Sequence, residues 1–162
     1  MEQFLPLTLR NYKRIKIQND ATRFIFNIYG QQKWEPITPF LKKLHFLPVK
    51  FRIKFKIALM VFKCINNIAP DYLSSLIMLR NPNRYSVRMD NDYYLLEMNS
   101  FANVKRVEGA FSYQAPEVWN NLPYEIRSLN ELSKFKIALK TFYFKCAYLH
   151  DDNIQSGSTC LG

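Results

Sequence analysis

The chain has 162 residues, of which 48% are hydrophobic and 15% aromatic, with no run of 18 apolar residues. This composition is typical of a globular domain and argues against a disordered or membrane-spanning chain. Lys and Arg outnumber Asp and Glu by 23 to 13, a net charge of +10, and residues 10–63 hold 13 of the basic groups against Asp20 and Glu35 alone. Such a gathered charge indicates a polyanionic partner, nucleic acid before membrane, or else a solvated basic face.

The clearest predicted element is a long central helix. Between Val49 and Ile68, apolar residues recur at spacings of three and four, which predicts a helix that ends at Asn66 and Asn67. Phenylalanines form a second apolar stripe along it, so this helix should be buried on several sides. Its cations are left on one narrow, solvent-facing strip, formed by Arg52, Lys56 and Lys63.

Two similar stretches predict shorter helices. APDYLSSLI at residues 69–77 and APEVWNNLP at residues 115–123 each place a proline before an acidic residue. This order predicts helices with Pro70 and Pro116 at their first positions. Trp119 lies one turn into the second helix, where it can anchor a core. The predicted structural anchors, including the proline that starts the turn PYEIR, are Pro70, Pro116, Trp119 and Pro123.

The chain is predicted to close with another long helix. Residues 132–149 carry apolar side chains at helical spacing, with Ser133 as the N-cap. The polar stretch before the second proline motif suits a loop with a small β-hairpin around residues 93–109. We therefore expect a mainly α fold, with a compact multi-helix domain over residues 1–150 and a disordered tail at residues 151–162.

The N-terminus and the cysteines predict a reducing compartment. The first residues, MEQFLPLTLR, lack the basic and apolar regions of a signal peptide, so we expect an intracellular protein of the cytoplasm or nucleus that is not secreted. Cys64, Cys146 and Cys160 are odd in number and form no C-x-x-C pair. This pattern predicts reduced thiols, with neither disulfides nor a cysteine zinc site.

Residues that could carry chemistry are few. The chain has two histidines, four glycines and no nucleophile motif, which argues against histidine metal sites and phosphate-cradling loops. His45 is interpreted as a packed helix-end residue, since no carboxylate stands near it in sequence. Asp90 with Asp92, and Asp151 with Asp152, could hold magnesium on charge alone, but both pairs are interpreted as solvated acids. We expect neither a cofactor nor a metal.

Two blocks of the chain resemble a known family. LKKLHFLPVKFRIKFKIALMVFKCINNIAPDYLSSLI at residues 41–77, and GAFSYQAPEVWNNLPYEIRSLNELSKFKIALKTFYF at residues 109–144, are similar to blocks at the C-terminus of LINE-type, non-LTR retrotransposon (jockey-like) reverse transcriptases. KRIKIQNDATRFIF resembles the segment that precedes them. Departures are modest: Phe46 replaces the usual Trp, Tyr113 and Gln114 replace small residues, and Arg106 stands for an Arg usually nearer Gly109.

The resemblance covers residues 10–146 in the family's order and spacing. It implies a C-terminal region that lacks the endonuclease and the polymerase palm with its aromatic-x-Asp-Asp turn. The sequence LHDD is no substitute, because Leu149 stands where the aromatic residue belongs. The chain alone is therefore predicted not to be an enzyme.

Three hypotheses follow for function. In the first, the chain is a non-catalytic module that binds the RNA or DNA backbone. In the second, it is a structural fragment that packs against the missing upstream reverse transcriptase domains, or a relic reading frame. In the third, it is an enzyme that uses an acidic pair. We favour the first, with no membrane partner and the oligomeric state left open. The predicted nucleic-acid-binding residues are Lys42, Lys43, Lys50, Arg52, Lys54, Lys56 and Lys63.

Overall fold

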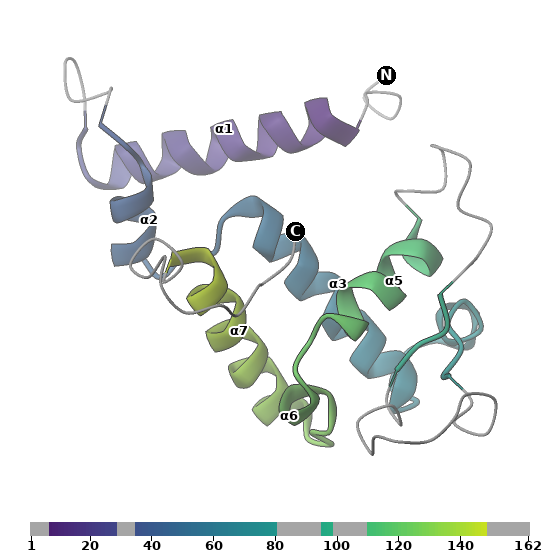
Figure 1. Cartoon of the computed structure of the whole chain (residues 1–162). Helices are drawn as coiled ribbons and strands as arrows, with labels where there is room; N and C mark the ends of the chain where they lie inside the picture. Colours follow the sequence, from purple (N-terminus) through teal and green to yellow (C-terminus); the bar gives the residue numbers. More distant parts are fainter. Residues whose placement is uncertain (1–6, 29–34, 81–94, 99–109, 149–162) are drawn as a thin grey trace, which may run out of the picture. The chain divides into compact units, whose positions relative to one another are not determined.

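Helices dominate the part of the chain that the computed structural model describes, which is residues 7–28, 35–80, 95–98 and 110–148 (Figure 1). They are α1 (Leu7–Ile25), α2 (Thr38–Lys43), α3 (Val49–Ile65), α4 (Asp71–Ser74), α5 (Phe111–Asn120), α6 (Tyr124–Arg127) and α7 (Leu132–Tyr148). Among these residues the only β pairing is a single isolated bridge. The predicted mainly α fold class is confirmed.

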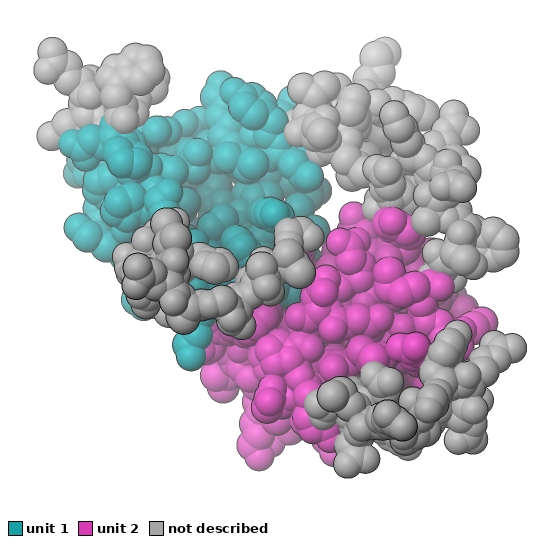
Figure 2. Space-filling model, viewed as in Figure 1, with its two compact units in different colours: residues 1–53, 143–158 teal, residues 54–142, 159–162 magenta. Residues whose placement is uncertain are grey.

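The chain divides into two compact units (Figure 2). Unit 1 comprises residues 1–53 and 143–158, and unit 2 comprises residues 54–142 and 159–162. Unit 1 contains α1 and α2, unit 2 contains α4, α5 and α6, and both α3 and α7 contribute residues to each unit. The single domain over residues 1–150 stays a prediction, and the predicted tail lies outside the described residues.

Unit 2 is built around stacked aromatic side chains. The ring centroids of Phe62 in α3 and Phe135 in α7 lie 4.2 Å apart, and the ring of Trp119 in α5 lies 5.8 Å from that of Phe135. All three side chains are fully buried, as are Val61 and Leu139. Large aromatic side chains contribute much of the energy of a core. Trp119 thus lies in the core, where the sequence placed it, and its role as an anchor stays a prediction.

The prolines differ in how well the sequence placed them. Pro70 and Pro123 are the N-cap residues of α4 and α6, so both stand at helix starts. The sequence predicts Pro70 to be the first residue of its helix, and it lies directly before that residue. The prediction for Pro116 is wrong, because α5 begins at Phe111 and contains Pro116 in its interior. A proline there cannot donate the intrahelical hydrogen bond. Its fully buried ring, packed in the core, offsets that loss.

The start of α7 also differs from the prediction. The helix begins at Leu132, so Ser133 lies within its first turn and is not the N-cap. Glu131 precedes the helix instead, where its carbonyl accepts the N–H of Phe135 at 2.9 Å and its carboxylate pairs with Lys134 at 2.9 Å. A carboxylate at this position also interacts favourably with the helix dipole.

A side-chain amide holds residues 95–98 against α5. Asn120, the last residue of α5, accepts the N–H of Leu96 with Oδ1 and donates from Nδ2 to the carbonyl of Leu96, both at 2.9 Å. Leu96 is fully buried and forms an antiparallel bridge with Leu79. Most of the β-hairpin predicted around residues 93–109 lies outside the described residues, and its described part pairs with Leu79.

In unit 1, α1 packs through a polar face. Gln18 Nε2 donates to the carbonyl of Leu47 at 2.8 Å, and the buried Thr22 hydroxyl donates to the carbonyl of Gln18 at 2.8 Å. Five large apolar residues of α1 are exposed instead: Tyr12, Ile15, Ile17, Phe24 and Ile25. Because they do not share one face, they give no periodic signal. The sequence therefore did not predict this helix.

Three helices end in the same motif without glycine. α1, α2 and α3 are each followed by a residue with φ between 52° and 55°, namely Asn27, His45 and Asn67. In each case this residue donates its N–H to the carbonyl three positions earlier, and the next residue donates to the carbonyl five positions earlier. This is the Schellman arrangement, in which a left-handed residue closes the helix. The predicted end of α3 is confirmed.

Candidate nucleic-acid interface

The structure divides the seven predicted nucleic-acid-binding residues between the two units. The four in unit 1 are all exposed: Lys42, Lys43, Lys50 and Arg52. Of the three in unit 2, Lys56 is exposed, whereas Lys54 and Lys63 are half-buried. In the predicted solvent-facing strip, Arg52 and Lys56 are thus exposed and Lys63 is half-buried. Within the described ranges, none of the seven forms an ion pair.

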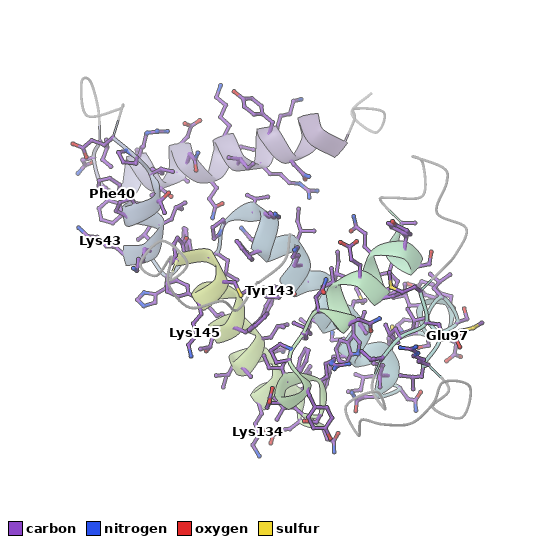
Figure 3. The ribbon with its side chains drawn as sticks, viewed as in Figure 1. Phe40, Lys43, Glu97, Lys134, Tyr143 and Lys145 are labelled. Carbon is purple, nitrogen blue, oxygen red and sulfur yellow. The ribbon has the colours of Figure 1, made fainter. Side chains whose placement is uncertain are left out.

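The helix ends place the unit 1 cations in two different electrostatic settings. Lys42 and Lys43 occupy the last turn of α2, where the helix dipole favours positive charge, and Lys43 Nζ lies 5.9 Å from the ring centroid of Phe40 (Figure 3). Lys50 and Arg52 instead occupy the first turn of α3, which carries no acidic residue. There the partial positive charge of the helix end adds to that of the side chains.

Among the described residues, unit 1 carries a larger net positive charge than unit 2. The described residues of unit 1 include ten Lys and Arg residues and two acidic residues, a net charge of +8. Those of unit 2 include eight Lys and Arg residues and five acidic residues, a net charge of +3. The two acidic residues in the described part of unit 1 are Asp20, whose Oδ1 lies 4.0 Å from Arg23 Nη1, and the exposed Glu35. Over the full sequence unit 1 has eleven Lys and Arg residues against five acidic ones, a net charge of +6, and unit 2 has twelve against eight, a net charge of +4. Unit 1 is therefore the more positive of the two, by a small margin over the full sequence and a larger one among the described residues.

His45 follows α2, as predicted for a helix-end residue, but its side chain is exposed. Its imidazole stacks on the ring of Phe144 in α7, with centroids 5.5 Å apart and planes inclined by 16°. The exposed Lys145 is the next residue along α7 (Figure 3). Sequence reasoning missed Phe144 as a neighbour of His45, because about a hundred residues separate the two in the chain and no local signal connects them.

Buried tyrosines support this part of unit 1. Burial raises the pKa of Tyr148 to about 12, and its hydroxyl donates to the carbonyl of Phe46, the residue after His45. Burial also raises the pKa of Tyr143, and the neighbouring Cys146 adds to the effect. Both hydroxyls are therefore neutral at physiological pH, and that of Tyr148 serves as a hydrogen-bond donor.

Groups with catalytic chemistry are not gathered within the described ranges. No cluster of three or more His, Cys, Asp or Glu side chains there is arranged to hold a metal ion. The acidic pairs Asp90 with Asp92 and Asp151 with Asp152 lie outside those ranges. Burial raises the pKa of Cys64, partly offset by a hydrogen bond with Ser74, so this thiol stays protonated and unreactive.

Among the described helices, none is both long and apolar enough to cross a membrane. Comparison of the chain with protein-family models, with curated proteins and with solved structures gives no match.

Proposed function

We propose that the chain binds the phosphate backbone of RNA or DNA, chiefly through the cations of unit 1, as the non-catalytic C-terminal region of a LINE-type reverse transcriptase. One observation carries this proposal. The four cations of unit 1 at the ends of α2 and α3 are exposed, and no described acidic residue neutralises them. Exposed Lys and Arg groups of this kind make the sequence-independent contacts with phosphate that dominate nucleic-acid affinity.

The two cations at the start of α3 favour phosphate binding over the alternative that the basic surface has no function. Lys50 and Arg52 lie at the helix end where the dipole opposes positive charge, at a cost of about 0.3–1 kcal/mol each. Folding therefore gains nothing from their charge at these positions. A phosphate group bound at this helix end would reverse the sign of the interaction, because both the cations and the dipole would then stabilise it.

The test is the salt dependence of binding. Fluorescence anisotropy with a mixed-sequence RNA or duplex should show affinity that falls steeply with salt and varies little with sequence. The triple change of Lys42, Lys43 and Lys50 to Gln should reduce the magnitude of the negative slope of log K against log salt by roughly 2–3 units, at about 0.7–0.9 per phosphate contact. Folding should survive, because surface changes usually cost within about 0.5 kcal/mol.

A matched control removes three other exposed lysines. Lys134, Lys136 and Lys140 lie on α7 within unit 2, so their triple change to Gln alters the net charge by the same amount. This control should leave the slope nearly unchanged. Equal losses in both triple variants would mean that only net charge matters, and an unchanged slope in the unit 1 variant would refute the proposal.

One observation favours a second candidate function, that of a protein-interaction fragment. Ile17 and Phe24 lie two turns apart on α1 and are 69% and 72% exposed. Exposed apolar side chains at helical spacing can anchor a helix in the groove of a protein partner. A LINE-type reverse transcriptase that lacks its own C-terminal region, supplied in trans, should then bind the chain in titration calorimetry. The Phe24→Ser variant should weaken that binding, and unchanged binding would count against this candidate.

A further inference from the structure

Three rings of unit 1 form a column with one buried end and one exposed end. The imidazole of His45 stacks on Phe144 at 5.5 Å, and the ring of Phe144 lies 4.7 Å from that of Tyr148. Tyr148 is only 3% exposed, and its hydroxyl donates to the carbonyl of Phe46. The inner end of the column is therefore fixed by burial and a hydrogen bond, while its outer end is an exposed imidazole.

The backbone at His45 indicates that the ring is not there to end the helix. His45 has a φ of 52°, a conformation that disfavours a residue with a β-carbon. Glycine is the usual residue at this position of a Schellman motif, and asparagine stands there after α1 and α3. A histidine thus closes α2 at a steric cost, and what it adds is a flat ring held parallel to Phe144 at the surface.

Three exposed cations lie close in sequence to the two stacked residues. Lys42 and Lys43 precede His45 in the last turn of α2, and Lys145 follows Phe144 in the last turn of α7. No described acidic residue pairs with any of them. An exposed flat ring with cations on the same helices combines the two features by which proteins hold unpaired bases, since a base stacks on the ring and cations bind the flanking phosphates.

We infer that the His45–Phe144 stack is a platform for an unpaired base, so that unit 1 binds single-stranded nucleic acid in preference to duplex. This inference rests on the proposed function and narrows its substrate class. A base within a duplex is already stacked on both faces and cannot lie on the imidazole. A single strand gains the stacking energy in addition to the phosphate contacts, whereas a duplex gains the phosphate contacts alone.

The experiment compares a fluorescein-labelled, mixed-sequence RNA of about 20 nucleotides with the same strand annealed to its complement, both by anisotropy at fixed salt. His45→Gly removes the ring and suits the left-handed backbone, so the variant should fold. It should lose roughly tenfold in affinity for the single strand, the scale of one base stack, and little for the duplex. His45→Trp should keep the preference for the single strand.

Asn67→Gly is the matched control, because Asn67 occupies the same Schellman position after α3 but has no ring. It should change neither affinity. Equal affinity for the two probes, or an unchanged single-strand affinity in His45→Gly, would overturn the platform even while the lysine variants still lower the salt slope. Absence of binding to both probes would overturn the platform and the proposed function together.

Discussion

The two units use aromatic side chains for opposite purposes. Unit 2 stacks Phe62, Phe135 and Trp119 within its interior, and none of the three is more than 1% exposed. Unit 1 has an exposed imidazole at the end of its ring column, and its helix α1 exposes Phe24. Unit 1 also carries the larger net charge, +8 against +3 among the described residues. The comparison shows that high aromatic content alone does not distinguish a buried core from an exposed surface.

The largest expected effect tests the interior of unit 2. Trp119→Ala should lower the free energy of unfolding by roughly 3–5 kcal/mol, the range for removing a large buried aromatic side chain, and could unfold the chain at room temperature. Thermal and urea unfolding followed by circular dichroism would measure the loss. Tyr72→Ala is the control, because Tyr72 is 69% exposed in the same unit, and this change should cost within about 0.5 kcal/mol.

If Trp119→Ala instead kept the melting temperature and weakened RNA binding, Trp119 would be a base-stacking residue, and the contrast between the two units would fail. The contrast between buried rings in unit 2 and an exposed ring in unit 1 would be supported if Trp119→Ala destabilised the chain while His45→Gly did not. His45→Gly should be tolerated because glycine suits the left-handed backbone and the ring that is removed is exposed.

The sequence predicts those features of the structure that neighbouring residues determine, and misses those that tertiary packing determines. The long helix α3, its end at Asn67 and the burial of Trp119 follow from apolar spacing and local capping, which are properties of neighbouring residues. The interior position of Pro116 does not, because a proline before an acidic residue ordinarily marks a first turn and only tertiary packing overrides that preference.

The candidate site divides in the same way. The cations of residues 42–63 can be read from the sequence as a charge excess, but their exposure cannot, and the structure leaves Lys54 and Lys63 half-buried. The ring column joins residue 45 to residues 144 and 148, from opposite ends of the chain. Such contacts between distant segments follow from the fold and leave no periodic or compositional trace.

The stability of the chain should also depend on pH through unit 1. Its ring column contains a tyrosine, Tyr148, whereas the three central rings of unit 2 carry no titratable group. The pKa of Tyr148 is raised to about 12 in the folded chain, against about 10 in an unfolded chain. Between these values the unfolded state has lost a proton that the folded state still holds. The free energy of unfolding should therefore fall as pH rises from about 10 to 12, by up to about 1.4 kcal/mol per pH unit for this group.

Tyr148→Phe should flatten that part of the pH profile, measured by urea unfolding at several pH values. At neutral pH the variant should be less stable by about 0.5–1.5 kcal/mol, because the carbonyl of Phe46 loses its hydrogen-bond donor. A profile with equal steepness in the wild type and Tyr148→Phe would show that Tyr148 ionises as easily in the folded chain as in the unfolded one.

The smallest expected effect comes from the predicted binding residues of unit 2. Lys54 and Lys63 are half-buried and only Lys56 is exposed, so these three present less of their side chains to a phosphate than the three exposed lysines of unit 1 do. The triple change to Gln should lower the salt slope by less than about one unit, against roughly 2–3 for the unit 1 triple. Anisotropy across the same salt range measures both, with circular dichroism as the folding control. A loss as large as that of unit 1 would mean that the backbone contacts extend along the whole of α3, and the charge contrast between the units would then not determine where nucleic acid binds.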